Sequence, residues 1–174
     1  MNIILIGFMG AGKTTVGNVV AERLNQPLFD TDQLIEQQAG MSISKIFEVY
    51  GENEFRRLET EMLKENLSAS KDWVLSVGGG LPLKEENRGL LKKMGIVVYL
   101  RVQPDTVLQR LRGDKSRPLL QGGDVKQKVE SLFRQRGRIY EEVSDIVIDV
   151  DGKTPENIGQ EILTKTYCLD SKRT

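Results

Sequence analysis

The motif GFMGAGKT at residues 7–14 constrains the fold of this chain more than any other feature of its sequence. It follows the apolar run Asn2–Ile6, which is typical of a strand buried on both faces of a parallel sheet, and it precedes a segment of helical spacing at Thr14–Leu24. Glycines in such a turn let backbone N–H groups point inward, so that an anion lies at the positive end of the helix dipole. The motif therefore predicts a strand–loop–helix unit that binds the phosphates of a nucleotide.

The side chains at the end of this loop favour ATP and Mg²⁺ as ligands. We expect Lys13 to reach the β- and γ-phosphates and Thr14 to offer its hydroxyl to a magnesium ion that bridges them. A glycine-rich turn without a ligand is the alternative, but it gives Lys13 and Thr14 no role in packing. The expected nucleotide-binding residues of the loop are Gly10, Ala11, Gly12, Lys13, Thr14 and Thr15.

The rest of the chain alternates apolar runs with segments of helical spacing, which indicates an α/β fold. The further expected strands are Leu28–Phe29, Trp73–Val77, Ile96–Leu100 and Ile146–Ile148. Together with the first strand they predict a five-stranded parallel sheet between two layers of helices. A length of 174 residues fits a single domain over residues 1–174.

Several polar residues mark expected helix ends. Gly40 is expected to end a helix at Leu34–Gln38, and Ser42 is expected to cap the next helix. Thr154 and Pro155 suit the N-cap and the first turn of the last helix. The irregular stretch 113–124 is long enough to form a lid.

The composition excludes several classes of function. Lys plus Arg and Asp plus Glu both number 25, so the net charge gives no support for a nucleic-acid or membrane partner. The absence of histidine excludes His-based catalysis and His-ligated zinc, and a single cysteine excludes an intramolecular disulfide. The apolar N-terminal run is too short for a membrane span or a signal peptide. We expect a cytoplasmic monomer whose partner is a small molecule.

Nucleotide binding alone leaves the activity open, because GTPases, ATPases and kinases share this loop. The guanine-binding pattern Asn-Lys-x-Asp is absent, which disfavours a GTPase. An aspartate is also missing where the apolar strand Trp73–Val77 ends, since Gly78, Gly79 and Gly80 follow it. Asp30 and Asp32 are the carboxylates expected nearby.

Six motifs, in their order and approximate spacing, resemble the shikimate kinase family, and the resemblance extends to about Ile162. They are the loop 7–14, Asp30-Thr31-Asp32, Phe55-Arg56-Arg57-x-Glu59, Gly78-Gly79-Gly80, Arg117-Pro118-Leu119-Leu120 and Arg136-x-x-x-Tyr140. This resemblance implies transfer of phosphate from ATP to the 3-hydroxyl of shikimate, which gives shikimate 3-phosphate and ADP in aromatic amino-acid biosynthesis. It also implies a fold like that of the nucleoside-monophosphate kinases, with substrate-binding helices at about 32–67 and a short lid at about 113–124.

The resemblance assigns the two aspartates different roles. Asp30 lies near the magnesium ion, bound through water, and Asp32 orients the attacking hydroxyl of the substrate. A purely structural role for Asp32, as the N-cap of the following helix, remains open.

The resemblance also assigns Arg56 and Arg136 to the shikimate carboxylate, a task that suits the planar guanidinium fork. A surface ion pair between Arg56 and Glu52, four residues apart, is the open alternative. Glu59 either holds Arg56 in place or faces solvent. In a helix Arg136 points away from the face that Arg134 and Arg138 share, and only Arg136 matches the family motif.

The remaining assignments concern backbone groups and the nucleotide. Gly78, Gly79 and Gly80 are expected to bring N–H groups close to the substrate, although a flexible turn is the alternative. The resemblance places Arg117 over the phosphates as a catalytic residue, together with Lys13 and Asp32. It places Arg110 and Pro155 on either side of the adenine, and Pro155 also suits a simple first-turn role.

Two other functions remain open from the sequence. Another small kinase, such as a gluconate or nucleoside-monophosphate kinase, would share the fold and the loop but not the acceptor residues. A regulatory module that binds nucleotide without catalysis would not need Asp32 or Arg117.

Overall fold

The computed structural model describes residues 1–66, 72–112 and 123–171 of the chain. A five-stranded sheet in the order β2-β3-β1-β4-β5 lies at the centre, and all of its strand pairs are parallel. The strands are β1 (Ile3–Ile6), β2 (Leu28–Asp30), β3 (Val74–Ser76), β4 (Ile96–Arg101) and β5 (Ile146–Asp149). The predicted α/β fold with five parallel strands is confirmed.

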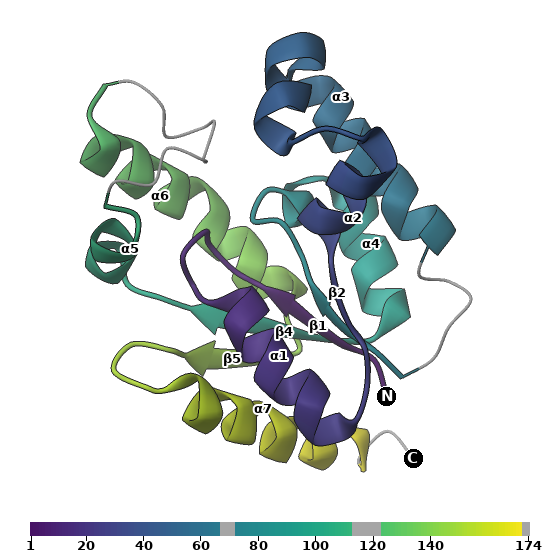
Figure 1. Cartoon of the computed structure of the whole chain (residues 1–174). Helices are drawn as coiled ribbons and strands as arrows, with labels where there is room; N and C mark the ends of the chain where they lie inside the picture. The colour runs from purple at the N-terminus through teal and green to yellow at the C-terminus, as the bar shows by residue number, and fades with distance from the viewer. Residues whose placement is uncertain (67–71, 113–122, 172–174) are drawn as a thin grey trace.

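Helices cover both faces of this sheet, as Figure 1 shows. They are α1 (Lys13–Leu24), α2 (Thr31–Ala39), α3 (Ile43–Asn66), α4 (Glu85–Met94), α5 (Pro104–Arg110), α6 (Val125–Val143) and α7 (Pro155–Asp170), with a 3₁₀ turn, η1, at Leu81–Leu83. Helices α1 and α7 pack together on one face, whereas α4 and α6 contact β4 from the other face (Figure 1). This is the predicted arrangement of three layers.

The middle strand β1 forms the centre of the core. All four of its residues have an exposed fraction of 0%, and Ile4 lies in register with Leu75 of β3 and Val97 of β4. A strand that is buried on both faces needs apolar side chains at every position, which explains the continuous run in the sequence. The carboxyl end of β1 therefore has a fixed position, and the glycine-rich loop starts from it.

The expected helix starts are confirmed at two places. The Ser42 hydroxyl accepts a hydrogen bond of 3.2 Å from the backbone N–H of Lys45 at the start of α3. The Thr154 hydroxyl accepts one of 3.3 Å from Asn157 at the start of α7, and Pro155 is the first residue of that helix.

Helix α3 consists of two helical segments that meet at Gly51. This residue has φ 83° and ψ 170°, a conformation that side chains other than that of glycine disfavour. No pattern in the sequence predicted this kink. It turns the second segment, which carries Arg56 and Glu59, relative to the first.

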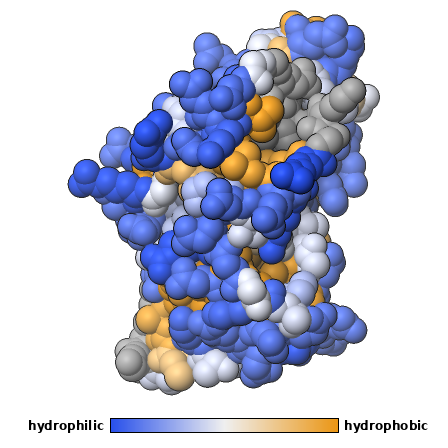
Figure 2. Space-filling model, turned by 90° about the vertical axis from the view of Figure 1, so that its left-hand side faces the viewer, coloured by the Kyte–Doolittle hydropathy of each residue, from blue (hydrophilic) through white to orange (hydrophobic). Residues whose placement is uncertain are grey.

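The face of the molecule drawn in Figure 2 is mostly hydrophilic. Figure 2 shows one side of the molecule, where hydrophobic residues appear only in small areas between polar ones. Among the described residues, no helix combines the length and the apolarity needed to cross a membrane.

Candidate active site

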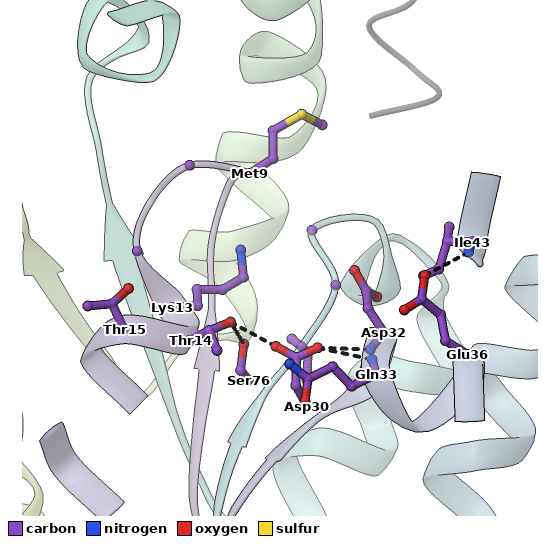
Figure 3. A pocket seen from close by; sticks show the side chains of 15 residues that line it. Met9, Lys13, Thr14, Thr15, Asp30, Asp32, Gln33, Glu36, Ile43 and Ser76 are labelled. Atoms are coloured by element: carbon purple, nitrogen blue, oxygen red, sulfur yellow. Dashed lines mark hydrogen bonds between the residues drawn. The ribbon is translucent and has the colours of Figure 1, made fainter. Parts of the chain in front are cut away.

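A cavity of about 460 Å³ lies where the carboxyl ends of β1, β2 and β3 meet the start of α1. Figure 3 shows Lys13 and Thr14 on one side of it and Asp32 and Glu36 on the other. The predicted residues that line it are Gly10, Gly12, Lys13, Thr14, Thr15, Asp30, Asp32, Gly78 and Gly79. The fold thus brings the glycine-rich loop and the acidic turn after β2 together.

The loop leaves the start of α1 free to bind an anion. Gly12 is the N-cap of α1, with φ 88°, and no side chain caps this helix. The first-turn N–H groups therefore have no side-chain acceptor, and they carry the positive end of the helix dipole. Ala11 itself is buried, and its N–H donates to the Phe8 carbonyl at 3.1 Å. The Ala11 side chain packs in the core, so only its backbone faces the loop.

Lys13 lies within the curl of the loop. Its Nζ donates to the carbonyl oxygens of Gly7 and Phe8, each at 3.0 Å. These two bonds hold the ammonium group beside the loop where a nucleotide phosphate would bind. Thr15 is exposed and lines the same cavity.

Thr14, Asp30 and Ser76 form a cluster of oxygen atoms at the base of the cavity. The Thr14 hydroxyl donates to Asp30 Oδ2 at 2.8 Å, and Thr14 Oγ1 lies 3.3 Å from Ser76 Oγ (Figure 3). Ser76 lies opposite Asp30 in the register of β2 and β3. Hydroxyl and carboxylate oxygens suit Mg²⁺, which keeps several water ligands and takes few from protein. These residues therefore fit a hydrated magnesium ion.

Ser76 was not predicted as a site residue. The strand β3 lacks the aspartate usual at its end, and Ser76 occupies that end. Asp30, on the neighbouring strand, supplies the carboxylate instead. The described residues contain no cluster of three acidic, cysteine or histidine side chains that could hold a metal by itself.

Asp30 also determines where α2 begins. Its Oδ1 accepts the backbone N–H groups of Asp32 at 3.0 Å and Gln33 at 3.4 Å, so Asp30 is the N-cap. The alternative that Asp32 caps this helix is therefore wrong, because the helix begins at Thr31 rather than near Leu34. Asp32 lies in the first turn and directs its carboxylate toward the cavity (Figure 3).

A smaller cavity of about 70 Å³ shares residues with the first. The predicted residues that line it are Asp32, Arg56, Gly78, Gly79, Gly80 and Arg136, which come from α2, α3, the turn after β3 and α6. The fold thus collects all the residues predicted to bind the acceptor. Four apolar residues that were not predicted as site residues also line it, Met9, Ile43, Phe47 and Phe55. Met9 and Phe55 belong to two of the motifs, but nothing in the sequence distinguished Ile43 and Phe47 from core residues.

Two carboxylates hold Arg56. Its Nη1 donates to Glu59 Oε2 at 2.7 Å and its Nη2 donates to Glu52 Oε1 at 3.2 Å. Glu59 has an exposed fraction of 0%, so the alternative of a solvent-facing Glu59 is wrong and its contact with Arg56 is confirmed. Burial raises the pKa of Glu59 to about 7, although the Arg56 guanidinium opposes this rise.

The three glycines leave room for these charged side chains. A Cβ atom at Gly78 would lie 2.6 Å from Asp32 Oδ1, and one at Gly80 would overlap the guanidinium of Arg56. A Cβ atom at Gly79 would lie 3.4 Å from Arg136 Nη1. A merely flexible turn would not explain why each glycine faces a different site residue.

Arg136 lies on the buried side of α6, with an exposed fraction of 3%. One helical turn later, the Tyr140 hydroxyl donates to the Gly79 carbonyl at 2.5 Å. Burial raises the pKa of Tyr140 to about 12, so this hydroxyl keeps its proton at neutral pH. Arg134 and Arg138 are exposed, and Arg138 pairs with Glu142 at 3.0 Å. The predicted distinction between Arg136 and its two neighbours is confirmed.

Comparison with known proteins agrees with this geometry. The family model described as shikimate kinase matches residues 9–167. The chain belongs to the shikimate kinase family. A shikimate kinase of Chromobacterium violaceum is 45% identical over 158 residues, which cover 91% of this chain and 84% of that protein. One of Thermodesulfovibrio yellowstonii is 40% identical and covers 99% of both chains.

A solved structure of this family has nearly the same fold. The shikimate kinase of Acinetobacter baumannii in complex with shikimate superposes with a TM-score of 0.92 and 42% identity. The match covers 99% of this chain and 95% of that one. The family resemblance noted from the motifs is thus confirmed over the whole fold.

The resemblance assigned three further residues to the binding of ATP. Arg110 and Pro155 do not line either of the two cavities, and Arg117 lies outside the described residues. Arg110 donates from Nη1 to the Gly10 carbonyl at 2.8 Å, so it contacts the phosphate loop from α5. Pro155 begins α7 and does not line either of the two cavities described above. Arg117 and most of the expected lid lie outside the described residues.

Proposed function

We propose that the chain transfers the γ-phosphoryl group of ATP to the 3-hydroxyl of shikimate, giving shikimate 3-phosphate and ADP for aromatic amino-acid biosynthesis. The observation that carries this proposal is the small cavity in which Asp32, Arg56 and Arg136 meet the three glycines, directly beside the phosphate loop. Two cations and one carboxylate suit an acceptor that has one carboxylate group and several hydroxyls. Membership of the shikimate kinase family supports the same acceptor.

The acceptor is held at both of its ends. Arg56 and Arg136 bind its carboxylate through guanidinium N–H groups. Asp32 accepts a hydrogen bond from the hydroxyl that attacks, and the backbone of Gly79 and Gly80 approaches the ring without side chains in the way. This arrangement directs one hydroxyl oxygen toward the larger cavity.

The phosphoryl group is transferred between the two cavities. The first-turn N–H groups of α1 and the ammonium group of Lys13 bind the β- and γ-phosphates. Thr14 and, through water, Asp30 would hold the magnesium ion, which supplies positive charge to the phosphate oxygens. A bond forms between the acceptor oxygen and the γ-phosphorus, and the bond from that phosphorus to the β–γ bridging oxygen breaks. The Asp32 carboxylate accepts the proton of the attacking hydroxyl.

The family resemblance supports further roles for three residues in binding ATP. Arg117 neutralises charge on the phosphates during transfer, and the lid at about 113–124 excludes water. Arg110 and Pro155 enclose the adenine. The contact of Arg110 with Gly10 supports its nearness to the nucleotide.

The test is ADP formation by the purified protein with Mg²⁺ and ATP, when shikimate, quinate, gluconate and AMP are added separately. We expect turnover with shikimate and not with gluconate or AMP. Arg136→Ala should raise the KM for shikimate roughly a hundredfold, the cost of losing a charge-assisted hydrogen bond of about 3 kcal/mol. Arg138→Ala is the matched control, since Arg138 is 87% exposed on the same helix. Equal effects of the two variants, or turnover with another acceptor, would contradict the assignment.

We further propose that the enzyme works as a monomer in the cytoplasm. One chain supplies all the residues assigned to both substrates, and ATP is available in that compartment. Light scattering of the purified protein, at concentrations used for the kinetic assay, tests the oligomeric state.

A further inference from the structure

Each of the two arginines of the acceptor cavity lies beside a phenylalanine ring, but their polar partners differ. Arg56 has its Cζ atom 5.3 Å from the centre of the Phe55 ring, and its Nη1 and Nη2 both donate to carboxylates. Arg136 has its Cζ atom 5.8 Å from the centre of the Phe8 ring, and its polar contact is with the Tyr140 hydroxyl. Within the described part of the chain, its buried Nε has no hydrogen-bond partner.

Phe8 is well placed to hold a cation because its own position is fixed. It belongs to the phosphate loop and has an exposed fraction of 1%. Its ring centre lies 4.1 Å from that of Phe133, which is one turn before Arg136 on α6. The Phe8 side chain thus packs against α6 at two successive turns.

An aromatic ring holds a guanidinium group without using its hydrogens. A cation within about 6 Å of a ring centre is attracted by the negative face of the ring, and most strongly where water is excluded. A carboxylate would hold Arg136 more tightly, but it would use some of the N–H groups that can bind the substrate carboxylate, as Glu52 and Glu59 do at Arg56. The ring orients a buried cation without using any of its N–H groups.

We propose that Phe8 is a positioning residue for the acceptor, which acts through Arg136. This inference rests on the proposed function, because it takes Arg136 as a ligand of the substrate carboxylate. It means that a residue of the nucleotide loop determines the affinity for the acceptor. Loss of the ring should leave the phosphate-binding backbone in place and release the guanidinium from its bound orientation.

The test compares Phe8→Leu with Phe133→Leu. Phe8→Leu removes the ring from Arg136 and from Phe133, whereas Phe133→Leu removes the same ring–ring contact and keeps the ring beside Arg136. For Phe8→Leu we expect the KM for shikimate to rise roughly five- to thirtyfold. Its kcat and its KM for ATP should stay within about twofold of wild type, and Phe133→Leu should stay within about twofold in all three constants.

Three results would overturn the proposal. They are an unchanged KM for shikimate in folded Phe8→Leu, an equal rise in both variants, and a parallel rise in the KM for ATP, which would indicate a distorted loop. Thermal unfolding checks that each variant is folded, and Phe8→Met, which has no ring, replaces the leucine variant if that one unfolds. Arg136→Ala separates the two proposals. If it raises the KM and Phe8→Leu does not, only the role of Phe8 fails.

Discussion

Replacement of Gly80 by alanine should weaken shikimate binding without unfolding the protein. Gly80 has φ −88° and ψ −16°, in the right-handed region, so alanine adopts this backbone without strain. The new Cβ atom would overlap the guanidinium of Arg56. This group is the far end of a flexible side chain, so it is Arg56 rather than the turn that must move.

The displaced arginine sets the size of the effect. Arg56 has to leave the place where it donates to Glu59 at 2.7 Å and faces the acceptor cavity. A charge-assisted hydrogen bond to the substrate carboxylate contributes about 1.5–3 kcal/mol, so the KM for shikimate should rise roughly ten- to hundredfold. Since Arg56 does not contact the transferred phosphoryl group in the proposed mechanism, kcat should change by less than about threefold.

The assay follows ADP formation at saturating ATP and Mg²⁺ while shikimate is varied. Gly89→Ala is the matched control, because it adds the same methyl group in α4, where no atom lies within 4 Å of the new Cβ. That variant should keep the wild-type KM, and its free energy of unfolding should rise by about 1 kcal/mol, since alanine is the better helix former. A folded Gly80→Ala protein with an unchanged KM for shikimate would refute the reasoning, as would a loss in kcat alone.

Three other predictions test neighbouring groups of the site. Gly78→Ala places a Cβ atom 2.6 Å from Asp32 Oδ1, so kcat should fall at least about tenfold, with the KM for ATP unchanged in the same ADP assay. Asp30→Asn keeps an oxygen that caps α2 but removes the charge beside Thr14, so a magnesium titration should show a higher concentration at half-maximal rate and an unchanged melting temperature. Burial raises the pKa of Glu59 from 4.5 to about 7, so the folded protein binds this proton more tightly than the unfolded chain. Its contribution to stability is then complete below pH 4.5 and is lost as the pH rises to about 7. Urea unfolding at several pH values should show wild type losing roughly 3 kcal/mol relative to Glu59→Gln over that interval, and parallel curves would contradict it.

The phosphate site was predictable from the sequence because one contiguous segment builds it. The strand, the glycines, Lys13 and Thr14 follow each other within twelve residues, so local spacing already determines their arrangement. The parallel sheet was predictable for a similar reason, since continuous apolar runs require burial on both faces.

The boundary of α2 was not predictable to the residue, and this had a consequence for the site. Its first turn, Thr31, Asp32 and Gln33, has no apolar periodicity. The helix was therefore predicted to start near Leu34, with Asp32 as a possible N-cap. The true start at Thr31 gives the cap to Asp30 and leaves the carboxylate of Asp32 for the cavity. A shift of one turn thus exchanges a structural role for a chemical one.

The acceptor site depends on contacts between distant segments, which no local pattern contains. The glycines at 78–80 are visible in the sequence, but what they make room for is Asp32, Arg56 and Arg136, which come from three different helices. Taken locally, Asp32 suits a helix cap and Arg56 suits a surface ion pair, and the ion pair of Arg56 with Glu52 is indeed present. Only the packing of α2, α3 and α6 around one turn decides which interactions coexist.

The family resemblance predicted that these residues lie together, because members of one family share the packing of their helices. It did not indicate that Glu59 is fully buried or that Phe8 lies beside Arg136. These two contacts join segments that are far apart in the sequence, so they are visible only in the structure.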